Sequence, residues 1–244
     1  MFTRAKRVTR LVVAFFLGFH ALMATADQPA KTLKILLDPG HSLASPGALG
    51  ARAIHEVHYN NTFTTELAHA LKTAGFQVLL TRLPEEEITL DKRAEVANSS
   101  GADLFLSIHH DSAQIRYLES IAVDGRPAWR SKIPLQGYSI FVSTTNPQFD
   151  KSLEFAKAMA GRLYTLGRKP TLHHAEQIPG ESRELLDSQL GIYRFDELLV
   201  LRKTKIPALL LEIGVIVDVQ DEAYVSSRSN RAAMVKAIVD ALTR

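Results

Sequence analysis

Several ionisable side chains lie at the ends of apolar stretches, or inside them, where burying a polar group is costly. His41 follows the run "LKILLDPG", His109 and His110 follow "DLFLSI", and Glu212 interrupts "ALLLEIGVIV". Glu56 lies in the polar segment "IHEVHYNN". Two imidazoles and one carboxylate, from His41, His109 and Glu56, form the donor set of catalytic zinc sites, which leave one coordination position open. These residue types predict metal-assisted hydrolysis at a site drawn from three separate elements.

Glu212 has the sequence environment of a general acid or base. Three leucines precede it and "IGVIV" follows it, so its carboxylate is costly to desolvate unless a cation or hydrogen bonds compensate. Beside a zinc site, such a carboxylate takes the proton of a water molecule and passes it to a leaving amine. Considered one at a time, these residues also allow purely structural roles. Glu212 would then be a salt-bridged glutamate at a strand end, and each histidine a hydrogen-bonded residue of the core.

Two local patterns limit the choice of metal ligands. In residues 54–61, His58 follows His55 by three positions and not four, so the His-Glu-X-X-His motif of metalloproteases is absent. The plain alternative for Glu56 is a structural one: a negative charge near the start of a helix interacts favourably with the helix dipole. His109 and His110 are adjacent, and neighbouring strand residues point to opposite faces, so we expect only one of them to enter the cleft.

The order of strand and helix patterns along the chain predicts an α/β fold, with a single domain and a mainly parallel twisted sheet flanked by helices. Predicted strands cover 33–37, 76–80, 103–108, 137–143, 197–202 and 208–217. Predicted helices cover 57–74, 90–98, 152–166 and 222–243, with a loop-like insertion at 112–136 and a polar, unclassified segment at 173–195. Parallel strands end at one edge of the sheet, so we expect the candidate residues to meet in one cleft there.

The N-terminal residues have the pattern of a secretory signal peptide. "MFTRAKRVTR" carries four basic residues and no acid, "LVVAFFLGFHALM" is apolar, and "ATA" offers small residues for cleavage. The apolar stretch is shorter than the roughly 20 residues of a spanning helix, which disfavours a stable membrane anchor. We expect a signal peptide at 1–26 with cleavage near Ala26, a linker at 27–32, a single domain at 33–244, and a periplasmic or secreted protein.

Composition excludes several classes of protein. Removing the signal peptide takes away four of the 29 Lys and Arg residues, which leaves 25 basic residues against 26 acidic ones. No basic block remains, so nucleic acid is not an expected partner. The chain has no cysteine, which excludes disulfides and a lipid-anchor cysteine after the signal.

Four motifs in order resemble the zinc-dependent N-acetylmuramoyl-L-alanine amidases of the type-3 amidase family, the cell-wall amidases of bacteria. "LLDPGH" is similar to the family's first-ligand motif and carries His41, and "SPGALG" followed by "HEV" points to Glu56. "LLTR", "LDKRAEVAN" and "ADLFLSIHHD" resemble the run whose histidine falls on His109. "LVLRKTKIPALLLEIG" resembles the segment that ends in the catalytic glutamate, Glu212. The resemblance extends over residues 32–242.

The resemblance implies that His41, Glu56 and His109 hold Zn²⁺ and that Glu212 acts as general base and then general acid. The implied reaction is hydrolysis of the amide between N-acetylmuramic acid and L-alanine, which makes 33–244 a zinc amidase catalytic domain with peptidoglycan as partner. Recognition of the wall then falls to this domain or to a protein activator. Two alternatives stay open: a zinc peptidase acting on peptidoglycan stem peptides, and a non-catalytic wall-binding protein of the same fold.

The chain departs from the family pattern close to the proposed ligands. Ser42 and Leu43 stand where glycines are common, and His110 and Asp111 stand where small residues and asparagine are common. "EIGVIVD" replaces the more usual "ETGF" type of sequence. None of these changes removes a proposed ligand, but they alter the groups around the site.

Some relatives carry an autoinhibitory helix, which the resemblance would place at residues 167–195. The segment "HHAEQIPGESRELLD" combines two histidines with several acids and a broken periodicity. We hypothesise that Glu176 or another acid of this segment approaches the zinc. A solvated loop with a short helix is the plain alternative.

Overall fold

The computed structural model describes residue 1 and residues 32–243. The chain divides into two units, Met1–Lys31 and Thr32–Arg244, and the structure described below is that of the second unit. Apart from Met1 and Thr32, the predicted signal peptide and the predicted linker lie outside the described residues. Within the described residues, no helix has the length and apolar character needed to cross a membrane.

One seven-stranded sheet forms the centre of residues 32–243. Its strands are β1 (Lys34–Pro39), β2 (Gln77–Leu80), β3 (Leu104–Asp111), β6 (Ser139–Val142), β7 (Leu185–Asp187), β8 (Ile192–Arg194) and β9 (Ala208–Val215). The order across the sheet is β2-β1-β3-β9-β6-β8-β7. The β6–β9 and β7–β8 pairs are antiparallel and the other pairs are parallel, which confirms the predicted, mainly parallel α/β sheet.

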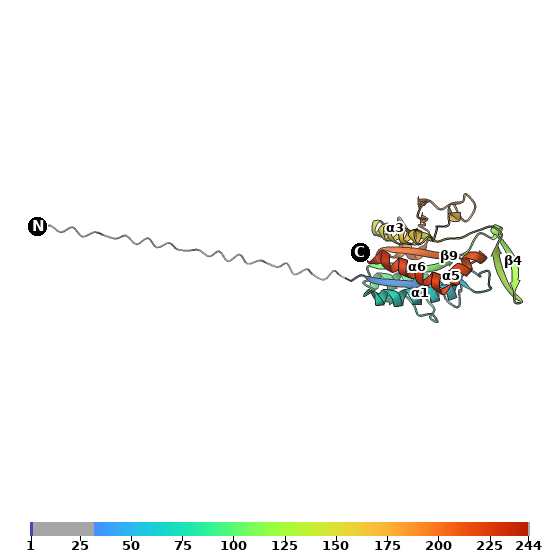
Figure 1. The fold of residues 1–244 in the computed structure, drawn as a ribbon, viewed down its shortest axis with the longest axis horizontal. Coiled ribbons are helices and arrows are strands. Elements are labelled where there is room, and N and C mark those ends of the chain that lie inside the picture. The colour runs from blue at the N-terminus through green and yellow to red at the C-terminus, as the bar shows by residue number, and fades with distance from the viewer. Residues whose placement is uncertain (2–31, 244) are drawn as a thin grey trace. The chain divides into compact units, whose positions relative to one another are not determined.

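Helices cover both faces of this sheet. They are α1 (Glu56–Thr73), α2 (Leu90–Ser99), α3 (Phe149–Thr165), α4 (Leu199–Lys203), α5 (Val219–Ser226) and α6 (Arg228–Leu242). Alternation along β3 serves the two faces: Leu104 and Leu106 join the core beneath α1, α3 and α6, whereas Phe105 joins the core beneath α2 and α4. Figure 1 shows α1 and α6 next to each other. Buried on both faces, the central strands read as continuous apolar runs.

The segment predicted as a loop-like insertion, 112–136, contains a β-hairpin. β4 (Leu118–Val123) pairs antiparallel with β5 (Arg126–Ser131), and the pair extends away from the sheet (Figure 1). The connecting Asp124 and Gly125 both have positive φ, as a tight two-residue hairpin turn requires. The Asp-Gly pair was the signal for this hairpin, but Pro127 inside the second strand made the segment resemble a loop.

The strand predicted at 197–202 is wrong, because this stretch forms the short helix α4. The side-chain amide of Asn146 donates to the carbonyl oxygens of Leu201, Thr204 and Ile206, which satisfies the backbone at the end of this helix. Leu201 is buried against the α2 side of the sheet. Five residues are too few to display a helical period, so the apolar run resembled a strand.

The single helix predicted at 222–243 is wrong as well, because α5 and α6 are separate. Ser227 has an extended conformation between them, with φ −70° and ψ 123°. Asp218 caps α5, since its carboxylate accepts hydrogen bonds from the backbone N–H groups of Gln220 and Asp221. The cap starts α5 at Val219, three residues before the predicted start at Glu222, and the chain turns before α6.

Candidate metal centre

The turn after β1 brings His41 to the edge of the sheet. The backbone of His41 has φ 62°, a left-handed conformation that residues with a side chain rarely adopt. Gly40, just before it, donates its N–H to the carbonyl oxygen of Ile108 in β3. A Cβ atom on Gly40 would lie 2.4 Å from the ring of His109, so only glycine lets the turn pass this imidazole. The Pro-Gly-His order thus brings two histidines together.

Two buried arginines hold this turn from the other side. Arg93 donates to the carbonyl oxygens of Pro39 (2.8 Å) and His41 (2.6 Å) and forms an ion pair with Asp38. Arg82 donates from Nε to the same carbonyl of His41 at 2.9 Å. Both guanidinium groups come from the "LLTR" and "LDKRAEVAN" motifs, and they stabilise a backbone conformation that is unfavourable on its own.

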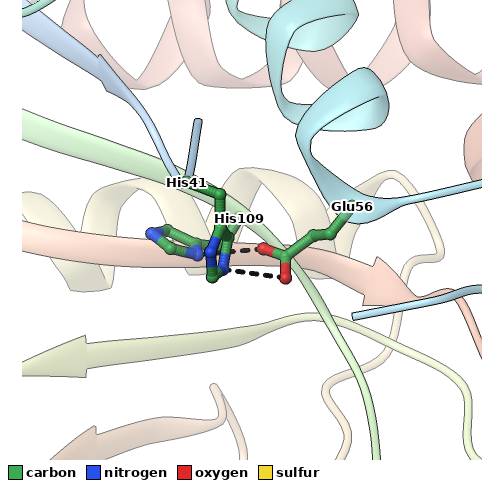
Figure 2. A group of neighbouring side chains, drawn as sticks. All are labelled: His41, Glu56 and His109. Carbon is green, nitrogen blue, oxygen red and sulfur yellow. Dashed lines mark hydrogen bonds and ion pairs between the residues drawn. The ribbon is translucent and has the colours of Figure 1, made fainter. Parts of the chain in front are cut away.

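Glu56, the first residue of α1, contacts both imidazoles (Figure 2). Its Oε2 lies 2.9 Å from Nε2 of His41, and its Oε1 lies 3.0 Å from Nδ1 of His109. Asn60, one turn further along α1, donates its amide to Oε1 at 3.0 Å, and the Ala48 N–H donates to Oε2. Burial by itself raises the pKa of Glu56, but hydrogen bonds and charges of the two histidines outweigh it and hold the pKa well below its usual value. Glu56 is therefore a fixed, ionised carboxylate.

The structure thus brings together three of the predicted residues, His41, Glu56 and His109, which we call the first cluster. One ligand atom from each lies within 4.8 Å of the others. Gly47 makes room for them, because a Cβ there would lie 2.5 Å from Glu56 Oε2. The side chains of His41 and His109 keep exposed fractions of 31% and 18%, so a ligand can reach them. Two nitrogens and one anionic oxygen fit a tetrahedral zinc ion with an open position.

Glu212 lies next to the first cluster without belonging to it. It is paired with His109 in the register of β3 and β9. Its Oε2 is buried and has no hydrogen-bond partner among the described residues. Burial, together with the negative charges of Asp111 and Glu56, raises the pKa of Glu212 well above its usual value. A carboxyl group of this kind is suited to hold and release a proton.

Comparison with known proteins gives the chain its family. Residues 35–244 match the family model described as N-acetylmuramoyl-L-alanine amidase. The chain belongs to this amidase family. The probable cell wall amidase LytH of Staphylococcus epidermidis is 30% identical over 233 residues, which cover 92% of this chain and 64% of that protein. The sporulation-specific N-acetylmuramoyl-L-alanine amidase of Bacillus subtilis is 40% identical over 86 residues, 33% of this chain and 32% of that protein.

Solved amidase structures share the fold. An N-acetylmuramoyl-L-alanine amidase from Clostridium difficile superposes with a TM-score of 0.66 at 20% identity, over 87% of this chain and 95% of that one. The apo form of an amidase from Mycobacterium abscessus gives a TM-score of 0.68 at 22% identity, over 86% and 97% of the two chains. The predicted single α/β domain and the predicted family are therefore confirmed.

The adjacent residues His109 and His110 of this amidase-family chain point in different directions. The side chain of His110 points away from the first cluster and packs beside Tyr59 and Phe63 of α1. Its Nδ1 lies 2.8 Å from the side-chain oxygen of Asn60. Burial lowers the pKa of His110 to about 3, so the ring is neutral. The expectation that only one of the two histidines enters the cleft is confirmed.

A cavity of about 390 Å³ opens beside the first cluster. His41, His109 and Ser107 line its polar side. Its apolar side is lined by Ile88, Leu90, Leu198, Leu199, Val200, Leu201 and Leu210. The helix α4, which the sequence pattern misassigned, therefore supplies much of the wall of the cavity.

Glu176 has its hydrogen-bond partner outside the first cluster. Its carboxylate accepts a hydrogen bond from the hydroxyl of Tyr117. Glu181, in the same segment, binds His174 and Arg183 instead. The hypothesis that one of these acids approaches the metal position finds no contact in the described residues.

Sequence reasoning missed the residues that support the first cluster. Asn60 follows Glu56 by one helical turn, and this spacing was the available signal for a shared hydrogen bond. Arg82 and Arg93 lie in quoted motifs, but no local pattern shows that they contact the turn at His41.

Proposed function

We propose that this protein is a zinc-dependent N-acetylmuramoyl-L-alanine amidase, a hydrolase that cleaves the amide bond between N-acetylmuramic acid and L-alanine in peptidoglycan. Family membership supports the activity. The observation that carries the proposal is the carboxyl of Glu212, whose buried Oε2 has no hydrogen-bond partner in the described residues, next to two histidines and an ionised glutamate. The chain covers 64% of the length of its LytH relative, so activity and substrate belong to the proposal.

His41, Glu56 and His109 would hold the zinc ion. The donor set, the closeness of the ligand atoms and the access to His41 all fit this metal. When bound, zinc polarises the substrate carbonyl and lowers the pKa of water, which is the chemistry that amide hydrolysis needs. Asn60 and the two arginines keep the ligands in place, in the manner of the hydrogen-bonded outer partners of metal sites.

Glu212 would be the general base and then the general acid. It takes a proton from the water that attacks the carbonyl carbon, and it delivers this proton to the nitrogen of L-alanine as the C–N bond breaks. The products are the free lactyl carboxylic acid and the free amine of the stem peptide. A carboxyl with an ordinary pKa is a poor acid–base catalyst near neutral pH, so the raised pKa of Glu212 favours this role.

The cavity beside the first cluster supports substrate binding at this position. Its apolar wall from α2 and α4 suits the lactyl and alanyl methyl groups on either side of the scissile amide. Its polar side contains the metal-binding histidines, so a bound amide would lie between the two kinds of surface.

The same proposal includes the organisation of the chain, its location and a protein partner. Residues 1–26 act as a signal peptide, 27–32 as a linker and 33–244 as the catalytic domain, in a periplasmic or secreted protein. A related structure, the CwlD amidase from Clostridioides difficile, contains the GerS lipoprotein in complex. This complex supports a protein partner, such as an activator, for the present chain as well.

Digestion of purified peptidoglycan tests the proposal, with the products identified by mass spectrometry. We expect intact stem peptides that begin with a free L-alanine amine, lost after chelation and restored by zinc. Glu212→Gln is the matched variant, because it keeps the shape of the side chain and loses its acid–base function. Shortened peptides would indicate a peptidase, and undigested wall with zinc bound would favour a wall-binding protein.

A further inference from the structure

A second cluster of metal-binding side chains lies at the end of β3 and consists of Asp111, His173 and His174. Asp111 ends β3, and the two histidines form the 3₁₀ turn His173–Ala175. Nε2 of His174 lies 2.7 Å from Oδ2 of Asp111, and Nε2 of His173 lies 3.5 Å from the same oxygen. One ligand atom from each residue lies within 4.8 Å of the others. The second cluster therefore repeats the donor set of the first with different residues.

The far nitrogen of each imidazole has its own partner. Nδ1 of His173 lies 2.8 Å from the hydroxyl of Thr171, and Nδ1 of His174 lies 2.9 Å from Oε2 of Glu181. Both Nε2 atoms are thereby directed at one carboxylate oxygen. Metal-binding histidines have this arrangement, in which a hydroxyl, carbonyl or carboxylate on one ring nitrogen orients the other nitrogen toward the ion.

An ordinary ion pair explains His174 but not His173. A protonated His174 between Asp111 and Glu181 is fully paired. The side chain of His173 is only 3% exposed, yet its Nε2 has no hydrogen-bond partner in the described structure. Buried polar atoms rarely lack a partner. A cation between the two rings and the carboxylate would provide one.

The distances are close to those of a bound ion. Two donors that bind zinc tetrahedrally at 2.0–2.1 Å lie roughly 3.3 Å apart. The two N–O separations of the second cluster, 2.7 and 3.5 Å, lie on either side of this value. The corresponding separations in the first cluster are 2.9 and 3.0 Å. Small movements of the side chains would complete the coordination.

We propose that Asp111, His173 and His174 form a second metal site, which binds a divalent transition cation of the zinc class. Two imidazoles and one carboxylate favour such ions over magnesium or calcium, which prefer oxygen ligands. The two clusters share no ligand, so this site goes beyond the proposed function. A cation here links the end of β3 to residues 171–183 and stabilises that segment beside Glu212.

Counting bound zinc tests the proposal directly. The metal-free protein is dialysed against zinc, and the ions per chain are measured by atomic emission. We expect two ions in the wild type, one in His41→Ala, one in His173→Ala and none in the double variant. His69→Ala, which removes an exposed histidine of α1, is the matched control and keeps two ions.

Cobalt provides a second readout that does not depend on activity. In the His41→Ala protein, added Co²⁺ should produce the visible absorption of a tetrahedral complex, and Zn²⁺ should displace it. One ion in the wild type and none in His41→Ala would overturn the second site and leave the proposed amidase intact. An ion that persists in the double variant would place the binding elsewhere and also overturn it. If His173→Ala fails to fold, the wild-type and His41→Ala counts decide alone.

Discussion

The two clusters contain the same donors, two imidazoles and one carboxylate, but they differ in construction and access. The first draws its ligands from three elements, namely the turn after β1, the start of α1, and β3. The second draws two of its ligands from adjacent residues, His173 and His174. Exposed fractions are 31% for His41 but 3% for His173 and 9% for His174. An accessible cluster suits turnover, and an enclosed one suits a structural ion.

The neighbours of the two clusters differ in the same sense. The first lies against a cavity and beside Glu212, whose carboxyl has an unpartnered oxygen. The second lies among side chains that are already paired, because Glu181 also binds Arg183 and Gln114. Identical donors therefore do not define a catalytic site. A cavity lined by its own histidines distinguishes the first cluster.

Replacing a ligand of the first cluster has the largest expected effect. His41→Ala should remove the ion from this cluster and lower peptidoglycan digestion to the rate without enzyme, because two ligands hold zinc poorly. Zinc content and product release measure the two effects on the same sample. Retention of full activity in this variant would separate the first cluster from the chemistry.

Replacing Glu212 should separate catalysis from metal binding. Glu212→Gln is expected to lower turnover by about 10²–10⁴-fold, the usual contribution of general acid–base catalysis, with the zinc content unchanged. Steady-state digestion rates and metal analysis test this expectation. A rate close to wild type would assign the proton transfer to another group.

Removing Arg93 should break the support of the first cluster and leave the second unchanged. Arg93→Leu leaves Asp38 buried without its cation and removes the hydrogen bonds to the carbonyls of Pro39 and His41. The expected loss in free energy of unfolding is about 3–5 kcal/mol, as for other broken buried ion pairs. Urea denaturation measures it. Arg93→Lys serves as the control, since it retains the charge without the paired geometry of the guanidinium.

A matched pair of substitutions outside the ligands should have the smallest effects. Asn60→Leu removes the amide that holds Glu56, and Thr171→Val removes the hydroxyl that orients His173. Each should weaken zinc binding about 10–100-fold at its own cluster and leave the other cluster unchanged. Competition with a chelating dye measures both affinities. Equal weakening at both clusters would mean that the two sites are coupled.

Some parts of the fold and of the site could be predicted from the sequence, and others could not. Fully apolar strands such as β1 and β3 were found because both faces are buried, whereas α4 was mistaken for a strand because five apolar residues show no period. The candidate ligands were found because polar groups at strand ends are costly unless they have a function. Asn60 and Arg93 were missed, because neither residue type is unusual in a helix.

The α/β class, the family, and the candidates His41, Glu56, His109 and Glu212 could all be found from the sequence, because they depend on local patterns. The tertiary structure adds that the ring of His110 packs beside Tyr59 and Phe63, away from the first cluster. It also shows that Arg93 binds the backbone carbonyl of His41, which lies 52 residues away in the sequence, and that Asp111 contacts His174, which lies 63 residues away. Such contacts follow from how strands and helices pack, and residues that meet in this way need no shared local pattern.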